Sequence, residues 1–281
     1  MPPVLTIARL TVFEAIRRRV VLTVFILTPL VIGLTAWGFS KLTHLSHNDG
    51  TPFSPDEARL RIAAFLILIA FMFSVVMAIG ASFLAAPALA IDIESGLLLA
   101  ILPRPIRRAE VVLGKWLGLA IPLVGYAFVA GGIELAVIQA VTGYLPPHPA
   151  QAISYIAAQS LVLLTITLLA STRLAPMASG IIVVVLFGAG WLIGIAQTVG
   201  ATYNNHALAN AGTAFSLAFP SDGLWRGAVS ALEPAALLAE GVQFDPLAAV
   251  SSPTTAYLIW AALWAAGMLG WAIHSFSRRD L

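Results

Sequence analysis

The chain has 281 residues, of which 59% are hydrophobic and only 10% are charged. Soluble domains carry charge on about a quarter of their residues, so this composition and the mean hydropathy of +0.93 exclude a soluble globular protein and predict an all-α integral membrane protein. The formal net charge is only +2, and the absence of cysteine excludes disulfides, thiolate metal sites and cysteine nucleophiles. No internal repeat or composition break is visible, so a single transmembrane domain over residues 1–281 is expected.

Residues 3–19 precede the first long apolar run and predict a helix. Glu14 stands three and four residues before Arg17 and Arg18, a spacing that brings the side chains together on a helix. We expect this helix to lie in the cytoplasmic interface of the membrane. The alternative is a cytoplasmic extension of the first span.

Six apolar runs are long enough to cross a membrane, since about 20 apolar residues span a hydrocarbon core about 30 Å thick. The first apolar run is longer than the apolar part of a signal peptide, and no clear small-x-small cleavage site follows it. We therefore interpret it as an uncleaved anchor. Pro87 predicts a kink near the end of the second run. The predicted spans are 20–39, 62–90, 116–140, 153–171, 177–199 and 254–275.

The Lys and Arg residues are distributed unequally between the two predicted sides of the membrane. Eleven of the 15 Lys and Arg residues fall in the N-terminal segment, the second and fourth connections and the C-terminal tail, whereas the other connections hold Lys41, Arg59, Arg61 and Arg226. Cytoplasmic loops carry the excess of positive charge. Both termini are therefore predicted to be cytoplasmic.

Two candidate sites involve acids or histidines. His44, His47 and Asp49 offer an i, i+3 metal pair, but a firm site needs three or four convergent ligands, so solvated side chains are the simpler interpretation and no metal is expected. Glu134 is the only acid inside a predicted span, which makes it a candidate for a substrate path or a subunit interface. The alternative is a carboxyl group that reaches external water or stays protonated and hydrogen-bonded.

The connection between the second and third spans contains a charged and proline-rich segment, residues 91–110. Glu94 ends an acidic stretch, Gly96 adds flexibility, and Pro103 and Pro105 prevent a continuous helix because neither has an amide donor. Arg107 opens the next helix. The result is a short amphipathic element near the cytoplasmic surface that offers a partner an apolar ridge and charges.

Gly114-Lys115 invites comparison with a phosphate-binding loop. That loop also needs a glycine five residues before Gly114 and a hydroxyl residue after the lysine, but Ala109 and Trp116 stand at those positions. Any ATP must therefore be bound by another polypeptide. The sequence also lacks H-E-x-x-H and G-x-S-x-G, so no catalytic residue is predicted.

Small residues four apart, Gly114 with Gly118 and Gly190 with Gly194, let helices approach closely. We interpret them as packing positions, with helix dimerisation as the alternative. The connection 200–253 is too long for a plain turn, so short helices that cap the external face are expected there.

The spacing Glu94-x-Gly96-x8-Pro105-x2-Arg108-x5-Gly114-Lys115 resembles the coupling-helix segment of ABC type-2 exporter permeases. The N-terminal helix and the basic tail 277–281 are similar to those of the same family. Residues 220–226, Pro-Ser-Asp-Gly-Leu-Trp-Arg, resemble a segment of the subgroup that includes the permease of nitrous oxide reductase maturation. Leu97 departs from the family pattern, which commonly has threonine after the glycine.

The resemblance implies six transmembrane helices, an N-terminal interfacial helix and a cytoplasmic coupling helix between spans two and three. It also implies a homodimer in a prokaryotic inner membrane, paired with two ABC ATPase subunits that hold ATP and magnesium, with no cofactor on this chain and no nucleic-acid partner. The residues implied to couple the chain to the ATPase are Glu94, Gly96, Pro105, Arg107, Arg108, Glu110 and Lys115.

The leading functional hypothesis is thus the permease subunit of an ATP-driven exporter. The second hypothesis is a membrane scaffold or mechanical transducer whose ATPase partner acts on an external protein without moving a solute, which the long connection 200–253 allows. A third, an ion-driven secondary carrier, is weakened by the single intramembrane acid and the absence of an inverted repeat.

Overall fold

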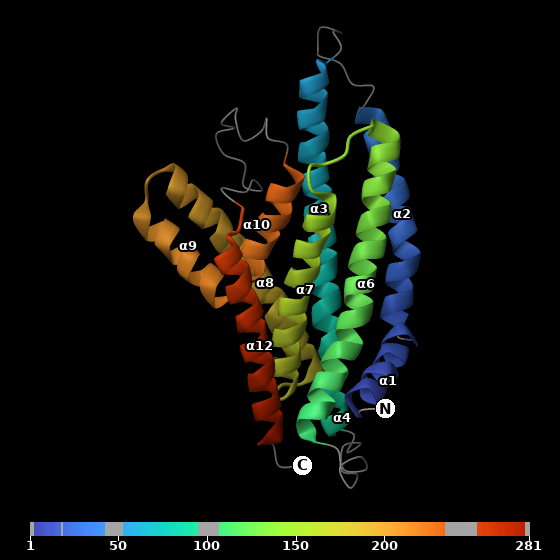
Figure 1. Cartoon of the computed structure of the whole chain (residues 1–281), viewed down its shortest axis with the longest axis vertical. Helices are drawn as coiled ribbons and strands as arrows, with labels where there is room; N and C mark the ends of the chain where they lie inside the picture. Colours follow the sequence, from blue (N-terminus) through green and yellow to red (C-terminus); the bar gives the residue numbers. More distant parts are fainter. Residues whose placement is uncertain (1–2, 18, 43–52, 95–106, 234–251, 279–281) are drawn as a thin grey trace.

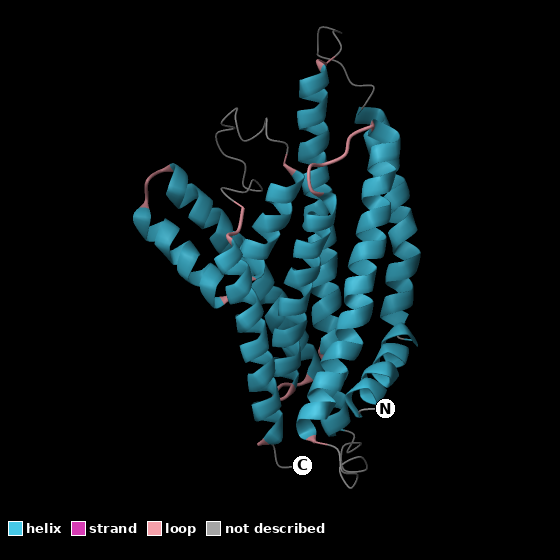
Figure 2. Cartoon of the chain, viewed as in Figure 1, coloured by secondary structure: helices cyan, strands magenta, loops and turns pink. Residues whose placement is uncertain are grey.

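The computed structural model describes residues 3–17, 19–42, 53–94, 107–233 and 252–278. Among these residues every regular element is an α-helix and no strand is present (Figure 2). The helices in chain order are α1 (Pro3–Arg17), α2 (Arg19–Leu42), α3 (Pro55–Ala85), α4 (Pro87–Glu94), α6 (Arg108–Thr142), α7 (Pro149–Ser171), α8 (Pro176–Thr202), α9 (His206–Ala218), α10 (Ser221–Leu232) and α12 (Thr255–Ser277).

Five helical segments are long and apolar enough to cross a membrane: Pro55–Asp92, Arg108–Thr142, Pro149–Ser171, Pro176–Thr202 and Thr255–Ser277. In α2, the apolar stretch among the described residues is the shorter Ile26–Leu42. Five of the six predicted spans are therefore present, and the first stays a prediction. The long second run breaks at Ala86, the residue before Pro87, and continues as α4.

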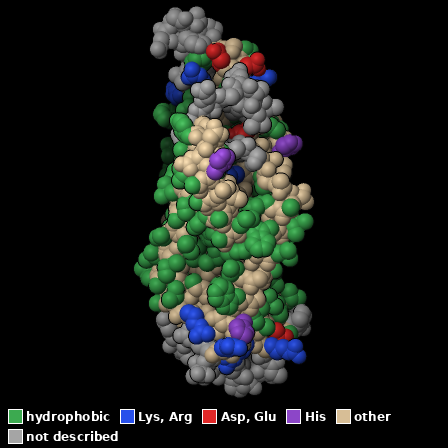
Figure 3. Space-filling view, turned by 90° about the vertical axis from the view of Figure 1, so that its left-hand side faces the viewer, with side chains coloured by type: hydrophobic (Ala, Val, Ile, Leu, Met, Phe, Trp, Pro, Cys, Tyr) green, Lys and Arg blue, Asp and Glu red, His purple; other side chains and the backbone are tan. Residues whose placement is uncertain are grey.

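The bundle has an apolar middle and charged ends. Figure 3 shows hydrophobic side chains over the middle of the visible face and charged side chains of both signs toward its two ends. The start of α1 and the end of α12 lie at the same end of the bundle as α4 (Figure 1). We refer to it as the terminus-bearing end.

The centre of the bundle is α7. Of its most hydrophobic stretch 72% is buried, against 11% for α12. It packs against α3, α6, α10 and α12. Its polar side chains find partners on those neighbours: Ser74 donates to Oε1 of Gln159 at 2.7 Å, and the Trp116 indole donates to Thr165 at 2.9 Å. Hydrogen bonds of this kind help membrane helices to associate, because lipid tails are as apolar as the helix surfaces and the hydrophobic effect does not drive helices together.

Helix α1 lies directly on the first half of α6. A Cβ added to Gly118 would stand 2.6 Å from the carbonyl oxygen of Ala8, and one added to Gly114 would meet Ile7 at 2.7 Å. Leu10 and Phe13, on the other side of α1, are exposed. The glycines of α6 thus make room for α1, whose other side carries large apolar residues outward, a pattern that suits a position in the membrane interface.

The connection 200–253 contains α9 and α10. α9 packs against α8, whereas α10 packs mainly against α7 and also touches α3 and α8. Gly190 faces the rings of Phe215 and Phe219, and Gly194 faces Asp222. Both pairs of small residues, in α6 and in α8, therefore serve helix packing within one chain, as interpreted from the sequence.

Candidate functional site

Two polar clusters stand out from the apolar bundle, one at the terminus-bearing end and one between α8 and α10. The first begins with Lys115, whose ammonium group forms an ion pair with Asp92 and also donates to the carbonyl oxygen of Ala88. The side chains of Lys115 and Asp92 are only 10% and 15% exposed. This pair joins α4 to α6 and so fixes the two helices that lead into and out of residues 95–106.

Arginines at the same end hold the C-terminus of α12. Arg108 donates to the carbonyl oxygens of Phe276 at 3.3 Å and Ser277 at 3.0 Å. Arg173 donates to the Ser275 hydroxyl at 3.0 Å and to its carbonyl oxygen at 3.4 Å. The last carbonyl groups of a helix lack partners within it and carry partial negative charge, so positive side chains are favourable here.

Arg107 and Glu110 start α6. The carboxylate of Glu110 accepts from the Arg107 backbone amide at 2.8 Å, which satisfies one of the amides that a helix start leaves unpaired. The Arg107 side chain is exposed, whereas those of Arg108 and Glu110 are half-buried and that of Lys115 is buried. Arg107 is therefore the described residue of the predicted coupling set that is most available to a partner.

Three coupling predictions cannot be placed in this way. Gly96 and Pro105 lie outside the described residues, as does the coupling helix itself. Glu94 is the last residue of α4, and its side chain is not described. The structure thus brings Arg107, Arg108, Glu110 and Lys115 to one end of the bundle, and the coupling role of the whole set stays a prediction.

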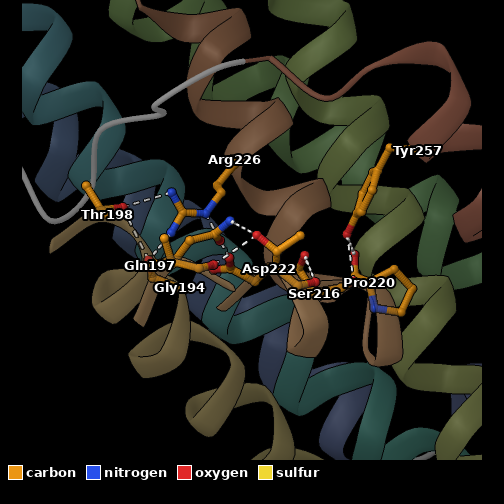
Figure 4. A network of polar contacts seen from close by, with 10 residues as sticks. Gly194, Gln197, Thr198, Ser216, Pro220, Asp222, Arg226 and Tyr257 are labelled. Carbon is orange, nitrogen blue, oxygen red and sulfur yellow. Dashed lines mark hydrogen bonds and ion pairs between the residues drawn. The ribbon is translucent and has the colours of Figure 1, made fainter. Parts of the chain in front are cut away.

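The second cluster centres on Arg226 of α10 (Figure 4). Its guanidinium group donates to Asp222 one turn earlier at 2.8 Å, to the Thr198 hydroxyl at 3.0 Å and to the carbonyl oxygen of Gly194. Asp222 is 5% exposed. Burial raises the pKa of the Asp222 carboxyl group, and the charge and hydrogen bond of Arg226 oppose that rise. The pair ties α10 to α8.

Glycines allow the close approaches around this pair. Any side chain at Gly194 would overlap the carboxylate of Asp222, and any at Gly223 would overlap the ring of Tyr257. The Tyr257 hydroxyl donates to the carbonyl oxygens of Ser216 at 3.1 Å and Pro220 at 3.3 Å, so α12 also meets the turn between α9 and α10 (Figure 4).

The sequence contained this second cluster without revealing it. Residues 220–226 carry a family resemblance, and the charge distribution places Arg226 in an external connection, but neither pattern predicts an ion pair with Asp222. Their i, i+4 spacing on a helix was the available signal. The contacts of Arg226 with α8, and of Arg108 and Arg173 with α12, join residues far apart in the chain, which no local pattern reports.

Glu134 of α6 lies half-buried against Thr35 of α2, which hydrogen-bonds with its carboxyl group. The other carboxyl oxygen, Oε1, has no hydrogen-bond partner among the described residues. The predicted role in a substrate path or an interface stays a prediction. His44, His47 and Asp49 lie outside the described residues, and within those residues no group of three or more potential metal ligands is found.

The family model described as ABC-2 family transporter protein matches residues 5–281, nearly the whole chain. No curated protein matches the sequence.

Proposed function

The chain belongs to the ABC-2 family of transporter proteins, and on that premise we propose that it is the permease subunit of an ATP-driven exporter. Family membership and the long apolar helices make it a multi-pass membrane permease component. The match over residues 5–281 is the observation that carries the proposal. ATP coupling, export direction and partner subunits are the parts that experiment must test.

The arrangement at the terminus-bearing end supports coupling through residues 91–110. The Lys115–Asp92 pair fastens α4 to α6, and Arg108 fastens the start of α6 to the end of α12. A displacement applied between α4 and α6 therefore reaches three helices at once. Packed elements move as units rather than deforming continuously, so a small motion of this segment shifts whole spans.

The proposed partners are two ABC ATPase subunits, which bind ATP and magnesium, and a second copy of the permease. We place the complex in the inner membrane of a prokaryote, with six spans per subunit and both termini in the cytoplasm. Most of the Lys and Arg residues fall in the segments assigned to the terminus-bearing end, which supports that orientation. α9 and α10 then belong to the external half of the bundle.

The test is the ATPase activity of the complex, reconstituted in lipid nanodiscs with its cognate ATPase subunit. Arg107→Glu reverses an exposed charge beside the proposed coupling segment. We expect it to lower the permease-dependent part of the ATPase activity at least fivefold, with membrane insertion and thermal midpoint unchanged. Lys41→Glu is the matched control, since Lys41 is also exposed but ends α2 at the opposite end of the bundle.

Equal activity in Arg107→Glu and Lys41→Glu would contradict coupling at this end. Failure of any ABC ATPase subunit to co-purify with the unaltered chain would contradict the exporter proposal as a whole. Normal coupling without flux of any solute into vesicles would instead favour the scaffold that acts on an external partner.

A further inference from the structure

An apolar cavity of about 320 Å³ lies between α1, α2, α3 and α6. Its lining is almost wholly hydrocarbon and includes Ile16, Val24, Leu84 and Val129. The exception is Tyr126, whose hydroxyl group is already hydrogen-bonded to Thr28 of α2 at 2.8 Å. A ligand for this space must therefore be apolar, because the described lining offers it no free polar group.

The cavity exists because side chains are missing from two of its walls. Gly80 of α3 and Gly125 of α6 both line it, and a Cβ added at either position meets no atom within 4 Å. α2 packs along α6 and only lightly against α3, so it does not fill the gap. An unfilled space of this size loses the dispersion contacts of its lining atoms, which favours an occupant.

The length of the cavity and its lateral opening indicate what kind of molecule can occupy it. Its lining residues run from Val76 to Leu84 on α3, which corresponds to about 12 Å along the helix at 1.5 Å per residue. Val76 and Val129 are 44% and 58% exposed, so the cavity opens sideways between membrane-spanning helices. A hydrocarbon chain from the bilayer can enter by that route.

One end of the cavity lies next to positive charge. Ile16 lines the cavity, and the next residue, Arg17, is exposed at the end of α1. Arginine binds phosphate oxygens through several parallel hydrogen bonds. We propose that the cavity is a binding site for a bilayer phospholipid, with one acyl chain between α3 and α6 and the headgroup phosphate beside Arg17.

The test uses a phosphatidylglycerol with a photoactivatable diazirine at the end of one acyl chain. It is incorporated as a minor component into nanodiscs of the full-length protein, and labelled peptides are identified by mass spectrometry. We expect label on the segments 76–84 and 122–129. The probe is the only photoactivatable molecule in the nanodiscs, so label on these segments reports a bilayer lipid.

The decisive variant is Gly80→Leu with Gly125→Leu, which adds side chains to the cavity at two positions where a Cβ meets no atom within 4 Å. We expect labelling of the two segments to fall at least fivefold. Gly132→Leu is the matched control, because Gly132 is on the same helix, has equally open space and does not line the cavity. Gly80→Ala with Gly125→Ala should reduce labelling only partly, and thermal midpoints of all variants check folding.

The headgroup part is tested separately with Arg17→Gln. Labelling by the phosphatidylglycerol probe should fall about threefold. Labelling by a phosphatidylcholine probe of the same chain length should fall less. Equal labelling in the unaltered and cavity-filled proteins would overturn the site. Crosslinks between two copies through segments 76–84, with no lipid label there, would assign the cavity to a subunit interface and also overturn it.

Discussion

The two polar clusters hold their helices in different ways. At the terminus-bearing end, long side chains such as Lys115 and Arg108 reach across to carbonyl or carboxylate oxygens. Beside α10, Gly194 and Gly223 leave no room for a side chain of their own, because the Asp222 carboxylate and the Tyr257 ring occupy that space. Flexible side chains can release and rebind as helices shift, whereas a fit without spare volume resists displacement. The comparison indicates a movable end and a rigid outer half.

The largest effect is expected in the rigid half, from Arg226→Met. This variant leaves the carboxylate of Asp222 buried and without its charge partner, and removing one member of a buried ion pair costs about 3–5 kcal/mol. Chemical unfolding in mixed micelles measures it. The double variant with Asp222→Leu should recover most of the loss, and a double variant as unstable as the single one would contradict the ion-pair explanation.

At the movable end, Lys115→Met should cost less. It removes hydrogen bonds between charged groups that are still slightly exposed, worth about 1.5–3 kcal/mol. Asp92→Asn in the same background should restore part of the stability, because it removes the charge left without a partner. A loss larger than that of Arg226→Met would reverse the comparison between the two ends.

A smaller difference in stability is expected between alanine substitutions at two glycines of α8. Gly194→Ala places a methyl group against the Asp222 carboxylate, which costs about 1–3 kcal/mol, partly offset by about 0.5–1 kcal/mol of helix propensity. Gly190→Ala meets ring atoms of Phe215 and Phe219 no closer than 3.4 Å, so it should be neutral or slightly stabilising. Thermal midpoints that move equally for both would show that the close fit at Gly194 is unimportant.

Hydropathy predicted most of the architecture because long apolar runs leave the backbone no alternative to helices in a membrane. It indicated a break near Pro87 and room for helices in 200–253, where α9 and α10 lie. It could not show that Arg108 and Arg173 cap α12, or that Arg226 reaches α8. Those contacts depend on which helices become neighbours, and apolar composition does not encode the order of a bundle.

The coupling residues show the same limit. Sequence spacing grouped Lys115 with Arg107, yet the first is buried in an ion pair and the second is exposed. A spacing pattern reports that residues occur together and not which of them faces outward. Arg107 is thus the better probe of a partner surface, and Lys115 the better probe of the tie between α4 and α6.

On the proposed function, an ATPase subunit docks beside the start of α6. The chain contains no cysteine, so Arg107→Cys introduces a single thiol there, and Lys41→Cys introduces one at the opposite end of the bundle. With a short thiol-to-amine crosslinker, we expect a crosslinked product with the ATPase subunit from Arg107→Cys and none from Lys41→Cys. A product from Lys41→Cys alone, or from neither variant in an assembled complex, would contradict it.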